Sequence, residues 1–211
     1  PGLVYLSSVL AAINWVALQS SQNGGSETHT GAVANISILW DRAHPESPFY
    51  IGTDAAYWLQ ITLQGGVSTG VFFSVAAGNS NEPSCDLMPA AAGAGVPGIW
   101  TEIPGVMTVG ALRNAAEPMF TGIDVDGKIA SYGPCVEVWG PGQAVQSTGA
   151  YPGNGASLPS AQDGTVWGPG VPLDPSPANL YAGQNYYFPN TGSSMASPHG
   201  AGAALLVLRK V

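Results

Sequence analysis

Basic side chains are scarce in this sequence, whose 211 residues include only five lysines and arginines against thirteen aspartates and glutamates. The net charge of −8 argues against nucleic acid as a partner, because binding to phosphates depends on clustered Lys and Arg. The apolar run from Leu3 to Leu18 is interrupted by Ser7, Ser8 and Asn14 and is too short to span a bilayer. We therefore expect neither a nucleic-acid partner nor a membrane.

Cysteine is rare as well. Cys85 and Cys135 are too few for a disulfide scaffold but allow a single bridge, and an even cysteine count with few lysines favours a secreted protein. Charged residues make up only 9% of the chain, whereas 29 glycines and 18 prolines predict many tight turns and long ordered loops. With 45% hydrophobic residues, a chain of this length predicts one globular domain with a sizeable core.

Apolar periodicity predicts helices that alternate with strands. Residues 3–19 have helical spacing, and a second helix is expected from Thr53 to a stop at Gly65 and Gly66. Fully apolar strands between helices indicate an α/β fold with a mostly parallel sheet and helices on both faces. The expected strands are 32–40, 70–77 and 106–112, with shorter ones at 129–132 and 136–139 and an extended piece at 144–147.

The most informative stretch lies near the end, where Gly192-Ser193-Ser194-Met195-Ala196-Ser197-Pro198-His199 opens an apolar helix. Ser194 is expected in the first helical turn, where free N–H groups and the helix dipole favour a developing anion. Pro198 is expected to kink this helix. Gly200 and Gly202 each cost about 1 kcal/mol relative to Ala, which predicts that something packs closely against the backbone there.

This stretch resembles the nucleophile segment of the subtilisin-like serine proteases, Gly-Thr-Ser-Met-Ala-x-Pro-His, with Ser193 in place of Thr. Ala76-Ala77-Gly78-Asn79 resembles the family's oxyanion segment, and further landmarks at 35–38, 104–111, 130–134 and 138–142 follow in the family's order. The resemblance covers nearly the whole chain. It implies a subtilisin-like three-layer fold, Ser194 as the catalytic nucleophile and Asn79 as the oxyanion donor. It also implies that the bound peptide lies between Ser37, Ile38 and Leu39 on one side and Ala76, Ala77 and Gly78 on the other.

Two departures from the family pattern affect the expected cleft. Leu39 and Trp40 stand where the family usually has paired glycines, which predicts a narrowed or reshaped specificity pocket. Residues 149–191 form a longer segment than is typical and are expected to be an inserted loop near the cleft.

The base of the expected catalytic triad is missing from its family setting. Only His29, His44 and His199 occur, none in a His-Gly-Thr context, and His199 follows the serine on the same helix. We interpret residues 1–211 as the middle-to-late part of a protease domain, whose catalytic Asp and His come from an upstream segment or chain. An alternative within the chain is that His29 or His44 reaches Ser194, with Asp41 or Asp54 behind it.

No cofactor is expected to be required, but the resemblance implies a structural calcium site. In the proteinase K branch, two backbone carbonyls and a carboxylate bind the ion at positions matching Pro104, Val106 and Glu137, and that branch has Asp where Glu137 stands. A surface glutamate without a metal is the alternative interpretation.

The expected function is that of a secreted subtilisin-like serine endopeptidase that acts on protein or peptide substrates. One alternative is a non-catalytic pseudoprotease that keeps the fold and binds peptides or partners. Another is an extracellular peptide- or carbohydrate-binding module that uses the six tryptophans and eight tyrosines.

Overall fold

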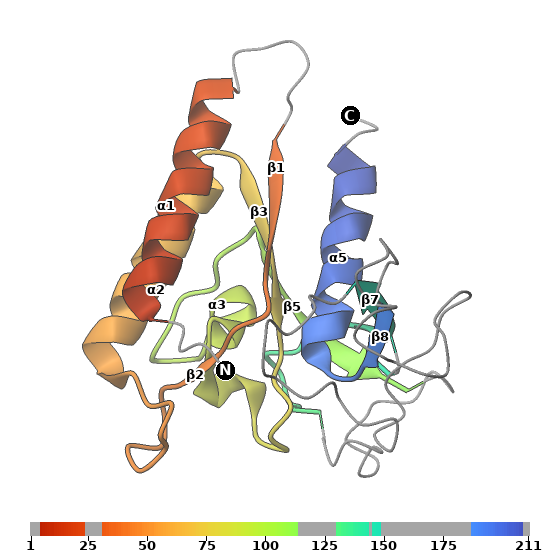
Figure 1. Ribbon diagram of the computed structural model, residues 1–211. Coiled ribbons are helices and arrows are strands. Elements are labelled where there is room, and N and C mark those ends of the chain that lie inside the picture. The colour runs from red at the N-terminus through yellow and green to blue at the C-terminus, as the bar shows by residue number, and fades with distance from the viewer. Residues whose placement is uncertain (1–4, 24–30, 114–129, 144, 149–186, 209–211) are drawn as a thin grey trace, which may run out of the picture.

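A parallel sheet with helices on both faces forms the body of the protein (Figure 1). The computed structural model describes residues 5–23, 31–113, 130–143, 145–148 and 187–208. The sheet order is β1-β3-β5-β6, and every neighbouring pair is parallel. The expected α/β fold is confirmed. The strands are β1 (Ala32–Ile36), β3 (Val71–Ala76), β5 (Val106–Leu112) and β6 (Val138–Pro141).

In the described segments, three helices cover one face of the sheet and one long helix covers the other. Helices α1 (Leu6–Asn23), α2 (Gly52–Ser68) and α3 (Ala90–Ala94) share one hydrophobic core with the inner strands. Helix α5 (Ser193–Leu208) lies across all four strands on the opposite face. Because successive side chains of a strand point to opposite faces, Phe73 and Val75 of β3 enter the large core, whereas Ser74 faces α5.

Short elements join the main layers. The 3-10 helix η1 (Ser84–Asp86) leads into β4 (Leu87–Met88), which pairs antiparallel with β2 (Trp40–Asp41). Strands β7 (Val145–Thr148) and β8 (Tyr187–Asn190) form a separate antiparallel pair. Strand β8 thus lies within the segment 149–191, of which residues 149–186 are outside the described part of the chain.

The predicted end of the second helix was wrong. Helix α2 continues through Gly65 and Gly66 to Ser68. A Cβ at position 66 would lie 2.6 Å from the ring of Phe73, so Gly66 serves close helix–sheet packing and does not end the helix. The strand expected at 32–40 also divides: β1 ends at Ile36, and Trp40 enters β2 after a three-residue break.

The two helical glycines of α5 differ in their surroundings. A Cβ at Gly200 would lie 2.8 Å from the Met107 side chain and 2.8 Å from the Ser74 hydroxyl, which confirms the expected close packing. A Cβ at Gly202 would have no atom of another described segment within 4 Å, so the same expectation was wrong there. Among the described helices, none has the length and apolar character needed to cross a membrane.

Candidate active site

The carboxyl ends of β1 and β3 meet the N-terminus of α5 at one edge of the sheet. Gly192 has φ 137°, which favours glycine, and its carbonyl accepts the first hydrogen bonds of the helix from Met195 (3.0 Å) and Ala196 (3.3 Å). Ser194 is therefore the second residue of α5. Open α/β sheets bind ligands at the carboxyl ends of their strands, so the fold places Ser194 where a ligand site is expected.

Asn79, which follows β3, is held against the residue before Ser194. Its Oδ1 accepts the N–H of Ser193 at 2.8 Å and the Ser193 hydroxyl at 3.1 Å, and that hydroxyl accepts the N–H of Gly78 at 2.9 Å. A backbone N–H only donates, so the bonded atom of the Asn79 amide must be its oxygen. The Nδ2 group consequently keeps its two N–H donors for another acceptor.

The free backbone N–H groups expected in the first turn include a specific second donor, the backbone N–H of Ser194. The first turn of a helix leaves N–H groups without helical partners; here Asn79 accepts that of Ser193 and Gly192 accepts that of Met195. In the described part of the structure, the N–H of Ser194 has no acceptor. The positive end of the α5 dipole lies at the same place, so both features favour a negative charge beside Ser194.

Pro198 frees the carbonyl of Ser194 for a bond across the site. A proline has no N–H, so it cannot donate to the carbonyl four residues earlier. That carbonyl instead accepts the Ser37 hydroxyl at 3.0 Å. The segment that follows β1 is thereby fastened to the backbone of Ser194.

A short relay of hydrogen bonds extends this connection. Ser197 donates to Asn35 Oδ1 at 2.7 Å, and Asn35 Nδ2 donates to the Ser37 hydroxyl at 3.0 Å. On β3, the Ser74 hydroxyl donates to the carbonyl of Ser197 at 2.8 Å. Four polar side chains thus fix the first two turns of α5 to β1 and β3.

The segments expected beside a bound peptide differ in what they can offer. Ala76 and Ala77 are fully buried, and a Cβ at Gly78 would lie 2.5 Å from the Ser131 hydroxyl, so only backbone atoms of this segment could face a ligand. Ser37, Ile38 and Leu39 are half-buried, and Ile38 packs against the large core. Trp40, expected to narrow the pocket, is buried in that core.

A hollow of about 510 Å³ lies beside Asn81, two residues after Asn79 in the chain. It is lined by Asn81, Tyr132, Gly133 and Trp139. The position of Tyr132 is fixed, because its N–H donates to the carbonyl of Glu82 at 3.2 Å and its carbonyl accepts the N–H of Ser84 at 2.7 Å.

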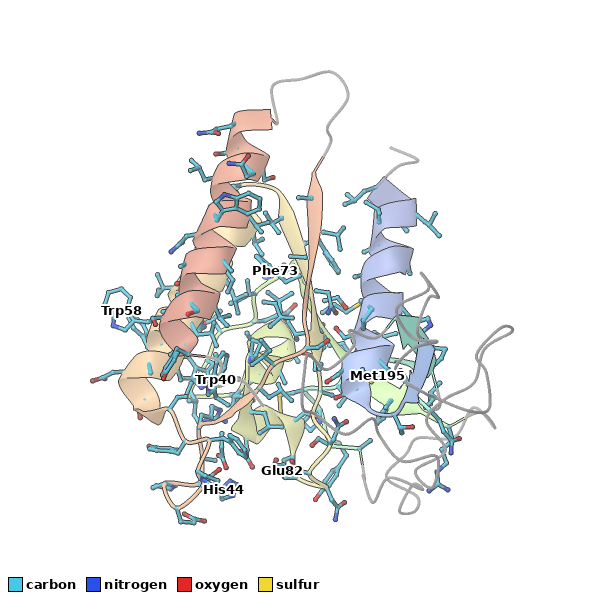
Figure 2. The ribbon with its side chains drawn as sticks, viewed as in Figure 1. Trp40, His44, Trp58, Phe73, Glu82 and Met195 are labelled. Carbon is cyan, nitrogen blue, oxygen red and sulfur yellow. A yellow bond between two sulfur atoms is a disulfide. The ribbon has the colours of Figure 1, made fainter. Side chains whose placement is uncertain are left out.

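Neither described histidine is hydrogen-bonded to Ser194. His44 Nδ1 contacts Asp41 Oδ2 at 3.1 Å, and His199 Nδ1 contacts the carbonyl of Met195 at 2.9 Å on its own helix. Figure 2 shows His44 in the loop beyond β2, well separated from Met195, the neighbour of Ser194. His29 lies outside the described residues.

The three expected calcium ligands surround the start of β5. Glu137 Oε2 accepts the N–H of Thr108 at 2.9 Å, and a Cβ at Gly93 would lie 2.2 Å from Oε2 and 2.9 Å from the Val106 carbonyl. The carboxylate and one expected carbonyl therefore border the same small space. Burial raises the pKa of Glu137 above its ordinary value, although the Thr108 hydrogen bond opposes this. An oxygen-only donor set of this kind fits Ca²⁺.

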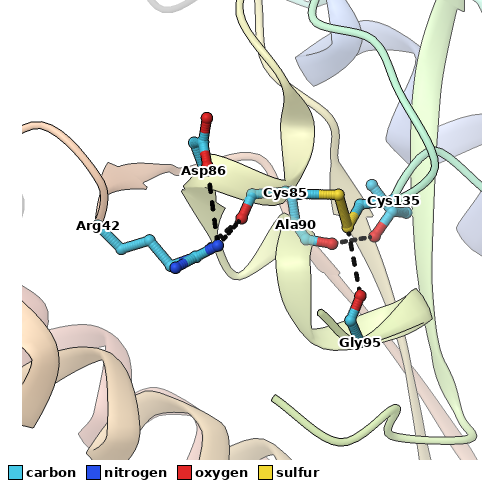
Figure 3. The surroundings of a disulfide bond; sticks show 7 residues. Arg42, Cys85, Asp86, Ala90, Gly95 and Cys135 are labelled. Carbon is cyan, nitrogen blue, oxygen red and sulfur yellow. Dashed lines mark hydrogen bonds and ion pairs between the residues drawn. A yellow bond between two sulfur atoms is a disulfide. The ribbon is translucent and has the colours of Figure 1, made fainter. Parts of the chain in front are cut away.

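Cys85 and Cys135 are joined by a disulfide with a Cα–Cα distance of 5.2 Å (Figure 3). The bond connects η1 to the segment before β6. Arg42 donates from Nε to the carbonyl of Cys85 at 2.8 Å and lies 3.7 Å from the Asp86 carboxylate. The disulfide and the contacts of Arg42 thus both hold the turn that contains Cys85 and Asp86.

The fold and this edge define an α/β protein that presents a serine at a helix entrance beside an amide donor, a combination typical of serine hydrolases. The model of the Subtilase family matches residues 2–211. The chain belongs to the subtilase family.

Individual relatives agree with this assignment. The chain is 27% identical over 209 residues to alkaline serine exoprotease A of Vibrio alginolyticus, covering 97% of this chain and 29% of that protein. It is 28% identical over 202 residues to subtilisin-like protease 1 of Arthroderma otae, covering 96% and 28%. A cold-adapted subtilisin-like serine proteinase of known structure has a TM-score of 0.58 and 22% identity, covering 99% of this chain and 50% of that one. The chain thus spans less than a third of these curated relatives and half of the solved structure.

Proposed function

We propose that the chain is the nucleophile-bearing part of a secreted serine endopeptidase that cleaves peptide bonds through an acyl-enzyme on Ser194. The hydrogen bond from the Ser193 N–H to Asn79 Oδ1 is the observation that carries this proposal. It fixes the amide so that Nδ2 is a donor, and the N–H of Ser194 is a second donor next to the serine hydroxyl. The single disulfide supports an extracellular location.

In the proposed reaction, the Ser194 hydroxyl adds to the carbonyl carbon of the substrate while its proton passes to a base. Asn79 Nδ2 and the N–H of Ser194 donate to the oxygen that becomes negative. The intermediate then expels the amine, which takes up the proton, and leaves an ester on Ser194. Water repeats the addition with the same base and releases the acid.

The base and the residue that orients it come, in this proposal, from a complementary segment that carries His and Asp. Strand β1 pairs with β3 alone in the described part of the chain, although its residues suit the interior of a parallel sheet. Near its end, α5 exposes three large apolar side chains that an additional layer could cover. These are Leu205 (56% exposed), Leu206 (66%) and Val207 (64%).

Substrate would lie as an extended chain between residues 37–39 and the backbone of 76–78. The hollow at Asn81 and Trp139 would receive a substrate side chain next to the oxyanion donors. We also propose that Pro104, Val106 and Glu137 hold a structural calcium ion, which would neutralise the Glu137 carboxylate.

A fluorophosphonate probe tests the proposed nucleophile. The protein is labelled alone and together with the complementary segment, and the modified residue is located by mass spectrometry. Labelling of Ser194 is expected to accelerate strongly with the complementary segment and to vanish in Ser194→Ala. Ser7→Ala, on the exposed face of α1, is the matched control and should label like the original protein. Equal labelling with and without the segment would contradict complementation.

A non-catalytic peptide-binding protein is the second candidate, because no described histidine contacts Ser194. In that case the complete protein would bind extended peptides at the same edge without reacting with the probe. Peptide affinity measured alongside labelling separates the two functions.

A further inference from the structure

Three ligating side chains from two separate segments meet beyond β2. Asp41 is the last residue of β2 and His44 lies in the loop after it, whereas Glu82 follows β3 and Asn79. One donor atom from each residue, a carboxylate oxygen or a histidine nitrogen, lies within 4.8 Å of the other two. Figure 2 shows His44 and Glu82 at the same end of the molecule.

Asp41 is buried, with 6% of its surface exposed, and its carboxylate is held by the backbone. Oδ1 accepts the N–H groups of Ala43 and His44, each at 2.9 Å. His44 Nδ1 lies 3.1 Å from Oδ2 and 3.2 Å from Oδ1. The two backbone N–H groups thus fix the carboxylate, with both of its oxygens close to the imidazole nitrogen.

The distance between Asp41 Oδ2 and His44 Nδ1 suits a shared ion. Two ligands about 2.1 Å from a tetrahedral metal ion are roughly 3.4 Å apart, close to the Asp41–His44 separation. Glu82 has a flexible side chain, so a small rotation about its torsions can bring its oxygen from within 4.8 Å to that spacing.

The backbone that carries these donors is fixed before any ion binds. Residues 40–41 pair with 87–88, and the Arg42 guanidinium is hydrogen-bonded to the carbonyl of Cys85 (Figure 3). The carbonyl of Glu82 accepts the N–H of Tyr132, and the Cys85–Cys135 disulfide closes the same region. A fixed backbone lowers the entropy cost of assembling a site from two segments.

We infer that Asp41, His44 and Glu82 form a binding site for a zinc-type divalent ion, with water completing four-coordination. A histidine nitrogen with two carboxylate oxygens suits Zn²⁺, whereas Ca²⁺ prefers six or more oxygen ligands. The ion replaces the contact between His44 Nδ1 and Asp41 and neutralises the two carboxylates. It links the loop after β2 to the segment after β3, and this role is independent of the proposed proteolysis.

Zinc binding to the chelator-stripped protein tests the site. Isothermal titration with ZnCl2 is expected to show one ion per chain at this site and a raised melting temperature. His44→Gln and Glu82→Gln are each expected to weaken zinc binding by more than about tenfold, since losing even an outer partner of a ligand costs that much. Glu46→Gln removes an exposed carboxylate from the same loop and is the matched control, with unchanged binding.

Two results would overturn the inference. One is the absence of zinc binding to the original protein. The other is equal zinc affinity in His44→Gln and Glu46→Gln, which would place the bound ion elsewhere. A titration with CaCl2 is expected to give the same calcium affinity in the original protein and in the three variants His44→Gln, Glu82→Gln and Glu46→Gln. Should one ligand variant fail to fold, the other still distinguishes these outcomes.

Discussion

The hydroxyl of Ser37 donates to the carbonyl of Ser194 across 157 positions of sequence, at 3.0 Å. Pro198 creates the opening for this bond, because it cannot supply the helical donor that this carbonyl would otherwise have. The proline in α5 therefore fastens the candidate nucleophile to the segment after β1. The residue that interrupts the hydrogen bonds of α5 thus also helps to fix the position of the Ser194 backbone in the site.

Ser37→Ala is expected to lower the free energy of unfolding by about 1 kcal/mol, because the Ser194 carbonyl loses its donor. The probe should also react more slowly with Ser194. Pro198→Ala restores a helical N–H to that carbonyl. Ser37→Ala should therefore lower the free energy of unfolding by less when Pro198 is also replaced by Ala. A double-mutant cycle of urea denaturation measures this coupling. A coupling of zero would show that the two residues act separately.

Asn79 is expected to contribute through Nδ2 and not merely through its bonds to Ser193. Asn79→Asp keeps an oxygen to accept the Ser193 N–H but removes the amide donor. The rate of peptide hydrolysis by the complemented protein should fall by about 10²–10³-fold, the magnitude known for such a donor in another subtilase. Stability should change much less than in Asn79→Ala, which loses both contacts. An unchanged rate in Asn79→Asp would exclude the proposed role.

The two glycines of α5 should respond in opposite ways to the same substitution. Gly200→Ala would press a methyl group against Met107 and Ser74 and should destabilise the protein by about 1–3 kcal/mol. The methyl group of Gly202→Ala would meet no atom of the other described segments within 4 Å and should stabilise the helix by roughly 0.4–1 kcal/mol. Thermal or urea unfolding of the two variants checks the contrast, and a shift of the same sign in both would contradict it.

Local sequence patterns predicted the parts of the fold that depend on local chemistry. Strand β5 occupies the predicted residues 106–112, because a continuous apolar run needs burial on both faces. The serine motif likewise located the start of α5. The bond of Ser37 to Ser194 was not predicted, since polar partners depend on loop geometry that has no periodic pattern. Asp41 behind His44 was considered only as part of an alternative catalytic base, whereas the structure pairs these two residues away from Ser194. Gly66 was misread because its close neighbour, Phe73, belongs to a different element.

Calcium should stabilise the protein through Glu137. Millimolar CaCl2 is expected to raise the melting temperature, because an ion that binds only the folded state adds its binding free energy. Glu137→Gln should abolish this rise, whereas Glu102→Gln, a nearby exposed acid, should retain it. The raised pKa of Glu137 predicts that the calcium effect weakens as the pH falls toward that pKa. An equal rise in both variants would place the ion elsewhere.

The contact between Asp41 and His44 predicts how stability depends on pH in protein kept free of metal by a chelator. The hydrogen bond to Asp41 and the charge of Asp41 raise the pKa of His44, and the charges of Glu46 and Asp86 raise it further. The Glu82 carboxylate also lies close to this pair. Burial raises the pKa of Asp41, but hydrogen bonds from the His44 and Ala43 backbone outweigh it, so the net pKa is lowered.

The sign of the effect follows from these two directions. The contribution of His44 is complete below its ordinary pKa of about 6.5 and is lost as the pH rises through the raised value. The contribution of Asp41 is present above about pH 4 and is lost as the pH falls through the lowered value. The pair therefore stabilises the fold most between about pH 4 and 6.5. The difference in urea midpoint between the original protein and His44→Gln should therefore be larger at pH 5.5 than at pH 8.5. If this difference does not change with pH, the contact between Asp41 and His44 does not stabilise the fold through the charge of His44.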